Sequence, residues 1–178
     1  MLTLYTREQG MVRAVAKGAR KMTSRKAGHL QPFTHVTIQL AKGRDLLIVT
    51  QVETVNAFLP LHDNLVKLGH AAYAVELLLR FSYEEEGGNP AIFRLLTETL
   101  DRIEKEDEAW LAVRYYEMRL LDAVGFRPQM FECANCGREI LAEDQYFSFT
   151  AGGVICPRCG QGLPNLAKIS VETLKYLR

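Results

Sequence analysis

Apolar and polar side chains alternate along the first part of the chain, up to about residue 58. In "HVTIQL", Val36, Ile38 and Leu40 alternate with polar residues, which is the period of a half-buried strand. Further short apolar stretches are "LTLYT", "MVRAVAKG" and "LLIVTQVETV", with the turns "REQG" and "KGRD" between strands. Short strands separated by turns, without helices between them, favour a small antiparallel barrel or sandwich. We therefore predict four strands in this part.

The pattern changes to a helical period near Pro60. Asp63 is placed to cap a first long helix that runs to about residue 81, and Asn89 followed by Pro90 begins a second. A third helix places Trp110, Val113, Leu120 and Val124 on one apolar stripe. The helices we expect cover residues 63–81, 91–106, 108–124 and 170–178.

Strands followed by helices predict an α+β fold. Four strands are one fewer than the five of an OB-type barrel, so the residues themselves favour a small antiparallel barrel or sandwich followed by a helical domain. We divide the chain into an OB-like barrel, a helical bundle, a cysteine-rich module and the start of a C-terminal helical segment, over residues 1–58, 59–130, 131–162 and 163–178.

The composition is that of an ordinary globular protein, with 48% hydrophobic and 24% charged residues. The N-terminal "MLTLYTREQG" lacks the basic flank and apolar stretch of a signal peptide, and no apolar run approaches the roughly 20 residues of a membrane span. We therefore expect a cytoplasmic protein.

Charge is distributed unevenly along the chain. Residues 1–58 carry nine Lys and Arg against three Asp and Glu (+6), and residues 59–178 carry thirteen against eighteen (−5). Such a split indicates that the first part faces a polyanion. Its basic side chains gather in one stretch without an acidic residue, at Arg13, Lys17, Arg20, Lys21, Arg25 and Lys26.

This basic stretch has two interpretations. Most Lys and Arg side chains are exposed in any protein, so on one interpretation the stretch only keeps the chain soluble or binds a protein partner. Against this, Arg13 and Lys17 share strand parity and would project from one face, and the loop after them holds four more cations that repel one another. We favour contact with the phosphates of a nucleic acid.

All four cysteines lie in two pairs, "CANCG" and "CPRCG". The pairs, Cys133 with Cys136 and Cys156 with Cys159, are separated by nineteen residues, and a glycine follows each second cysteine. Two residues between thiolates allow one tight turn to present both sulfurs to the same ion, so the spacing is typical of a four-thiolate zinc site. Disulfides are disfavoured in the cytoplasm, and four thiolates leave no open position for catalysis. We predict one structural Zn²⁺.

No local pattern of an active site is present in the sequence. The four histidines lie apart, and nucleophile, HExxH, GxGxxG and Walker-type motifs are absent. Within the second helix, Glu98 with Arg102 and Asp101 with Lys105 have the i,i+4 spacing of stabilising ion pairs. We therefore expect that the protein is not an enzyme.

The order of these motifs resembles the RecO recombination-mediator family of DNA repair proteins, in its zinc-carrying branch. The resemblance rests on "TREQGMVRAVAKGAR", "KGRDLLIVTQVE", "YYEMRLLDAVGFRP" and "CANCG…CPRCG", and it covers nearly the whole chain. Family members have one more strand before "LTLYT" and continue with further helix after "SVETLKYLR", so by this comparison the chain is short at both ends.

The resemblance implies an OB fold, a helical bundle and a zinc module. It also implies binding of single- and double-stranded DNA at the nucleoid, annealing of complementary strands, and association with RecR and with the acidic C-terminal tail of single-stranded-DNA-binding protein, which helps load RecA. On the third helix, Arg114 and Arg119 are candidates for contacting that tail. A zinc-ribbon enzyme such as a nuclease and an RNA-binding OB protein stay open as alternatives.

Overall fold

The computed structural model describes residues 1–19, 21, 23–82 and 87–178. The chain forms two compact units, Met1–Leu120 and Leu121–Arg178, and each is described here by itself. The α+β class and the OB-like N-terminal β-sheet predicted above are confirmed. Among the described residues, no helix is both long enough and apolar enough to cross a lipid bilayer.

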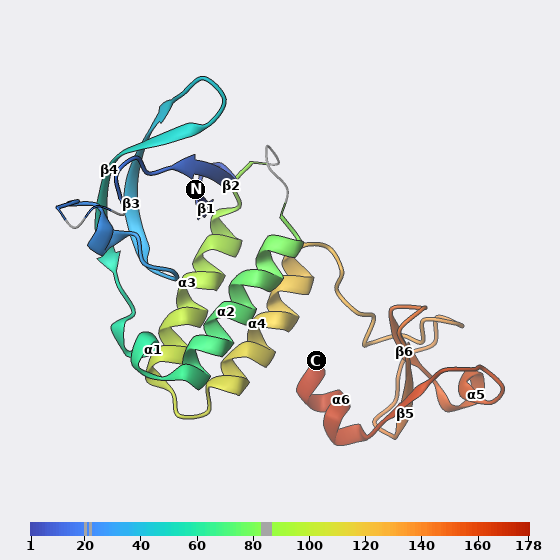
Figure 1. Ribbon diagram of the computed structural model, residues 1–178. Coiled ribbons are helices and arrows are strands. Elements are labelled where there is room, and N and C mark those ends of the chain that lie inside the picture. Colours follow the sequence, from blue (N-terminus) through green and yellow to red (C-terminus); the bar gives the residue numbers. More distant parts are fainter. Residues whose placement is uncertain (20, 22, 83–86) are drawn as a thin grey trace. The chain divides into compact units, whose positions relative to one another are not determined.

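The first unit begins with a four-stranded sheet, shown at the upper left of Figure 1. Its strands lie in the order β1-β2-β4-β3. β1 with β2 and β3 with β4 form antiparallel hairpins, whereas β2 and β4 run parallel, with Ala14 opposite Leu47 and Val15 opposite Ile48. The parallel contact is a detail that alternation in the sequence does not reveal. The strands are Leu2–Thr6, Gly10–Val15, His35–Lys42 and Leu47–Asn56, in chain order from β1 to β4.

In the described part of the first unit, four α-helices follow the sheet. Figure 1 shows α2, α3 and α4 side by side. In chain order from α1 to α4 they cover Leu59–Asp63, Leu65–Arg80, Pro90–Lys105 and Ala109–Ala123. Only the part of α4 up to Leu120 belongs to the first unit.

The start of α2 differs from the prediction. The chain becomes extended at Asn64, and the Asn64 Oδ1 atom accepts hydrogen bonds from the backbone N–H groups of Val66 (3.0 Å) and Lys67 (3.1 Å). Asp63 instead ends the short helix α1, so its predicted role as the cap is wrong. At α3 the prediction is confirmed, because Asn89 Oδ1 caps the helix and Pro90 is its first residue.

The core of the first unit is made largely of apolar side chains from the helices. On α3 the apolar residues at helical spacing, Ile92, Leu96, Leu100 and Ile103, are buried. The stripe predicted for α4 is wrong at Trp110, whose side chain is 52% exposed. The buried face of α4 includes two alanines, which a search for large apolar residues passes over. Its members are Ala109, Ala112, Val113, Tyr116 and Leu120.

The sheet contacts the helices through close backbone and ring packing. The Gly88 N–H donates to the carbonyl oxygen of Glu8, in the turn between β1 and β2 (3.0 Å). Gly10 has a φ of 67°, and a Cβ atom there would collide with the carbonyl group of Gly87. The His35 ring meets the Phe93 ring edge-on at 5.4 Å between centroids. These contacts hold the sheet on the N-terminal end of α3.

The second unit is a small three-stranded sheet with two short helices. The strands lie in the order β6-β5-β7, and β5 and β6 form an antiparallel hairpin between the two cysteine pairs. Ser170 caps the last helix by accepting from the Thr173 N–H. Its elements are β5 Gln145–Ser148, β6 Gly153–Ile155, α5 Pro157–Gly160, β7 Ala167–Ile169 and α6 Val171–Leu177.

Candidate nucleic-acid interface and metal centre

The segment between β2 and β3 carries most of the predicted basic residues, and we name residues 16–30 the basic loop. Consecutive turns shape it, including Lys21 N–H to Gly18 O (3.0 Å) and Ser24 N–H to Lys21 O (2.9 Å). Gly18 has a φ of 73°, which favours glycine at the first turn. The loop ends in a short 3₁₀ helix, η1, at Ala27–His29. Local backbone bonds therefore order much of the described part of the loop.

Two side chains fasten the basic loop to β4. The Lys26 Nζ atom donates to the carbonyl oxygen of Val49 (2.7 Å), and His29 Nδ1 lies 2.8 Å from the Thr54 Oγ1 atom. Both side chains are half-buried. Sequence reasoning missed His29 and Thr54, because a contact across 25 residues leaves no local pattern. Lys26, predicted as a phosphate contact, uses its ammonium group in this link.

The other basic side chains are exposed. Arg13 projects from β2, and Lys17, Lys21 and Arg25 lie on the basic loop. Because β2 ends at Val15, Lys17 is in the turn that follows, and its predicted strand parity with Arg13 is wrong. Among the described residues, no carboxylate forms an ion pair with Lys17, Lys21 or Arg25. Arg20 lies outside the described residues.

These exposed cations create a positive field around the end of β2 and the basic loop. The part of the chain that contains them carries the +6 excess counted above, and the stretch from Arg13 to Lys26 contains no acid. Like charges held close together in water repel, and a polyanion relieves that repulsion while releasing its own counterions. The arrangement therefore fits a phosphate backbone.

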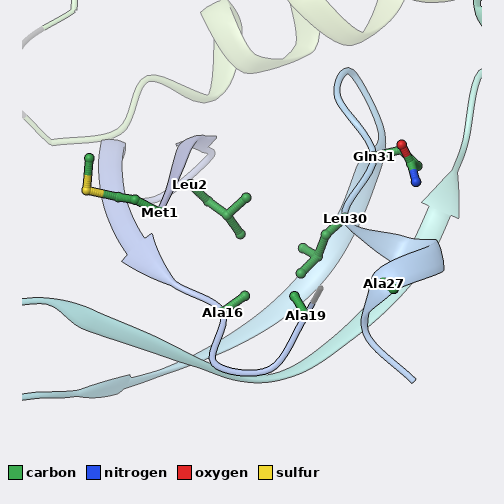
Figure 2. A pocket seen from close by; sticks show the side chains of 7 residues that line it. All are labelled: Met1, Leu2, Ala16, Ala19, Ala27, Leu30 and Gln31. Carbon is green, nitrogen blue, oxygen red and sulfur yellow. The ribbon is translucent and has the colours of Figure 1, made fainter. Parts of the chain in front are cut away.

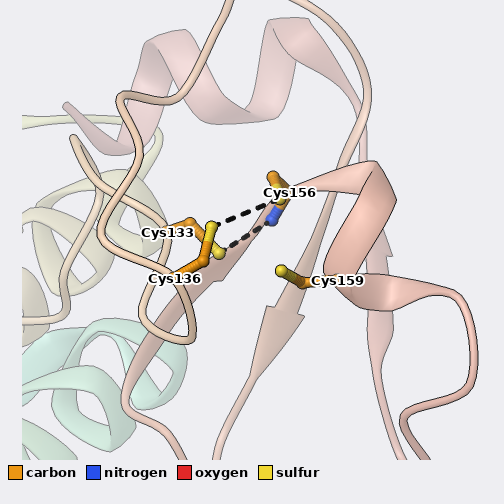
Figure 3. A group of neighbouring side chains, drawn as sticks. All are labelled: Cys133, Cys136, Cys156 and Cys159. Carbon is orange, nitrogen blue, oxygen red and sulfur yellow. Dashed lines mark hydrogen bonds between the residues drawn. The ribbon is translucent and has the colours of Figure 1, made fainter.

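The four cysteines come together in the second unit. Cys133 and Cys136 come from the loop before β5, Cys156 follows β6 directly, and Cys159 lies on α5 (Figure 3). Their four Sγ atoms all lie within 4.8 Å of one another, and the Sγ atoms of Cys136 and Cys156 are 3.9 Å apart. Four thiolates around a tetrahedral Zn²⁺, with Zn–S distances of about 2.3 Å, lie about 3.8 Å apart. The cluster can therefore hold a metal ion of this size.

Hydrogen bonds and neighbouring sulfurs set the pKa values within this cluster. Burial raises the pKa of Cys133, but backbone N–H groups, including that of Cys156 at 3.4 Å, outweigh burial and lower the pKa to about 6. At Cys136 the Arg138 N–H group lowers the pKa, yet slight burial and the three other sulfurs outweigh it and raise the pKa to about 11. The cluster therefore favours one thiolate and resists full ionisation without a cation.

The metal centre lies within a well-connected scaffold. Backbone bonds join Ala134 N–H to Val154 O (2.8 Å) and Cys133 N–H to Arg138 O (2.7 Å). The Arg178 guanidinium donates to the carbonyl oxygens of Met130 (3.0 Å) and Ile140 (3.2 Å), which ties the end of α6 to the cysteine segment. Cys133, Ile140 and Val154 are buried, whereas Cys136 is exposed, so the cluster lies at the margin of the core of this unit.

The predicted partner contacts, Arg114 and Arg119, lie on α4 and are exposed. Arg114 pairs with Glu117 (2.9 Å), and the Tyr73 hydroxyl on α2 donates to the same carboxylate (2.5 Å). Close by, Trp110 and Tyr115 are about half exposed. Cations beside exposed aromatic rings suit an acidic peptide with an apolar side chain.

The predicted ion pairs on α3 are formed in part. Lys105 binds Asp101, as expected (2.7 Å). Glu98 instead pairs with Arg94, and the Arg102 guanidinium lies over the Tyr115 ring at 4.8 Å from its centroid. An aromatic ring on the neighbouring helix thus competes for Arg102, which the spacing on one helix does not show.

Two family descriptions match the chain. Residues 1–58 match "Recombination protein O N terminal", and residues 62–178 match "Recombination protein O C terminal". The matches together span nearly all of the chain, and the basic loop and the four cysteines lie within them.

Curated relatives agree with these matches. A Dehalococcoides mccartyi protein is 39% identical over 181 residues, covering 100% of this chain and 70% of the relative. A Roseiflexus protein is 44% identical over 170 residues (95% and 59%), and one from Symbiobacterium thermophilum is 37% identical over 182 residues (99% and 72%). Each of the three is named DNA repair protein RecO.

Proposed function

Because the chain belongs to the RecO family of DNA repair proteins, we propose that it is a non-enzymatic mediator of recombination. It binds single- and double-stranded DNA, anneals complementary strands, and helps load the recombinase on strands coated with single-stranded-DNA-binding protein. The observation that carries this proposal is the basic loop, with its exposed cations and no acidic residue from Arg13 to Lys26.

Annealing by this loop requires charge and no bond-making step. Arg13, Lys17, Lys21 and Arg25 neutralise phosphates, and Arg20 adds to the same charge. Two strands repel through their phosphates, so lowering that charge allows complementary bases to meet. Lys26, through its link to Val49, holds the loop in place.

The cysteine cluster fits one structural Zn²⁺. The ligands would be Cys133, Cys136, Cys156 and Cys159, whose soft thiolates and mutual distances suit this ion. When bound, a four-thiolate Zn²⁺ holds structure and leaves no position for a substrate. The loop before β5 and the start of α5 would then be fixed together.

The surface around Arg114 and Arg119 is the proposed site for the acidic tail of single-stranded-DNA-binding protein. Arginines supply charge, and the exposed rings of Trp110 and Tyr115 supply apolar contact. RecR and, indirectly, RecA are the other proposed partners, and the protein would act in the cytoplasm at the nucleoid. Exchanging Arg114 for glutamine should weaken binding of a tail peptide, whereas the same change at Arg80, on α2, should not.

Salt dependence of DNA binding tests the role of the loop. The variant Lys17→Gln/Lys21→Gln/Arg25→Gln removes three exposed charges, and a slope of about −0.7 per phosphate predicts a log–log slope for single strands that is shallower by about 2. The matched control Arg80→Gln/Arg94→Gln/Lys105→Gln removes three exposed charges from the helices, where each is in an i,i+4 pair. An equal change in both variants would rule out the loop as the DNA contact.

The enzyme and RNA alternatives have separate tests. Incubating pure protein with a labelled single strand, its complement and a divalent cation should give annealed duplex and no shortened product. Cleavage that depends on the cation would favour a nuclease. In a competition between DNA and RNA of one sequence, DNA should bind at least as tightly, and a clear preference for RNA would favour an RNA-binding protein.

A further inference from the structure

A hollow lies between the start of β1 and the basic loop. It has a volume of about 280 Å³, and Figure 2 shows the side chains that surround it. We name it the loop hollow. Its walls include Leu2, Ala16, Ala19, Ala27, Leu30 and Gln31.

Polar and apolar atoms line the loop hollow in equal measure, and its side chains range from alanine to the larger Met1, Leu2 and Leu30. Three of the side chains are alanines from the basic loop, so methyl groups line a space that larger residues would fill. Gln31 is exposed and supplies an amide group that can donate and accept hydrogen bonds. A ligand with a broad apolar face and polar edges matches this lining.

The surroundings of the hollow carry positive charge. Lys17 follows Ala16 in the chain, and Arg25 and Lys26 precede Ala27. The phosphates that the proposed function assigns to this loop would therefore run beside the hollow. A nucleobase joined to those phosphates has two apolar faces and polar edges, which match the apolar and polar groups that line the hollow.

We propose that the loop hollow receives an unstacked base of a single DNA strand while the basic loop binds the adjacent phosphates. This inference rests on the proposed function, since it requires that the loop binds DNA. In a duplex each base is stacked and paired, and removing one costs energy that a single strand does not incur. The hollow thus makes the loop prefer single strands, whereas its charges bind both forms.

The anchors described above keep the walls in place. Lys26 and His29 flank the wall residue Ala27 and precede Leu30, and both are tied to β4. Backbone bonds from Ala27 N–H to Ser24 O and from Leu30 N–H to Ala27 O hold the same segment. The hollow is therefore shaped before a strand arrives, which reduces the ordering cost of binding.

The first test changes the ligand and leaves the protein intact. A thymidine oligonucleotide is compared with one of equal length in which abasic sugars carry the same phosphates. Binding of the normal strand should be tighter by about fivefold or more, the lower end of the range for one base held by a protein surface. Equal affinities would overturn the proposal. They would favour an apolar side chain of a protein partner as the occupant of the hollow.

The second test fills the hollow. Ala27→Leu adds apolar volume without a change of charge, and it should reduce the preference for the normal strand over the abasic one to near unity while duplex affinity stays the same. The matched control is Ala41→Leu, at an exposed position on β3 that does not line the hollow. If Ala27→Leu retained the full preference, the base would bind elsewhere and the proposal would be wrong.

The outcomes separate this inference from the proposed function. Wild-type protein that binds neither strand, or whose salt slope is insensitive to the loop charges, contradicts DNA binding by the loop itself. Normal and abasic strands that bind equally, with a salt slope that depends on Lys17, Lys21 and Arg25, contradict only the base-binding hollow. Because the abasic comparison uses wild-type protein, it remains decisive even if Ala27→Leu does not fold.

Discussion

Exchanging Lys26 for glutamine distinguishes an anchor of the basic loop from a phosphate contact. In the structure the Lys26 ammonium group donates to the Val49 carbonyl oxygen at 2.7 Å, which links the loop to β4. Lys21, on the same loop, is exposed and serves as the matched comparison. Each substitution removes one charge, so the two variants differ only in what the lost ammonium group contacts.

The expected loss of stability follows from the geometry of this bond. A hydrogen bond from a charged donor contributes about 1.5–3 kcal/mol, and the lower end applies because Lys26 is half-buried. With a urea m-value of about 2 kcal/mol/M, a loss of about 1.5 kcal/mol lowers the unfolding midpoint by about 0.7 M. Lys21→Gln should leave the midpoint nearly unchanged, since the exposed Lys21 side chain forms no hydrogen bond or ion pair with the described residues.

Two measurements check this reasoning. Urea unfolding is followed by the fluorescence of Trp110, the single tryptophan of the chain, which reports on the first unit. The log–log salt slope of single-strand binding should become shallower by about 0.7 in Lys21→Gln. In Lys26→Gln the slope should stay unchanged, while the affinity for the single strand falls by the same factor at all salt concentrations. A normal urea midpoint for Lys26→Gln, with a shallower slope, would show that Lys26 binds phosphate and would refute the anchor.

Four further perturbations have defined outcomes. The Tyr116 hydroxyl is buried without a hydrogen-bond partner among the described residues, so Tyr116→Phe should stabilise the first unit by about 1 kcal/mol. Burial, with a smaller effect of Tyr5, raises the pKa of Tyr116, so the folded state keeps the hydroxyl proton to a higher pH than the unfolded state does. The free energy of unfolding of the wild-type protein should therefore fall as the pH rises above 10.0. In Tyr116→Phe this fall should be smaller. Gly10→Ala should cost more than about 2 kcal/mol in urea unfolding, because its Cβ meets the Gly87 carbonyl. Removing metal with a chelator should expose four thiols to a titrating reagent and unfold the second unit by circular dichroism, while Trp110 fluorescence stays unchanged; protected thiols in metal-free protein would contradict a metal-held fold.

Local chemistry explains which parts of the molecule could be predicted. The paired cysteines are close in sequence, so their spacing alone predicts that two sulfurs share a turn, and the structure brings both pairs together. Asn89 and Pro90 likewise act on backbone groups within one helical turn. The apolar face of α3 was predictable because large aliphatic residues recur at helical spacing.

Features that depend on distant residues were not predictable from local patterns. The parallel contact of Ala14 with Leu47 and the bond from Lys26 to Val49 join segments that many residues separate. Trp110 was misplaced because alanines, whose small side chains carry a weak apolar signal, form the buried side of α4. The loop hollow is likewise formed by small residues that only the folded chain brings together.

The parallel contact between β2 and β4 has a consequence for the order in which the barrel assembles. The β3–β4 hairpin closes through a short local turn and can form early, whereas β2 reaches β4 only after the whole segment from Ala16 through β3 has been enclosed. The basic loop lies inside this enclosed segment, and both of its anchors are on β4. The shape of the loop is thus among the last features to form. A DNA strand bound as we propose would select the completed loop and would slow the opening of the whole sheet.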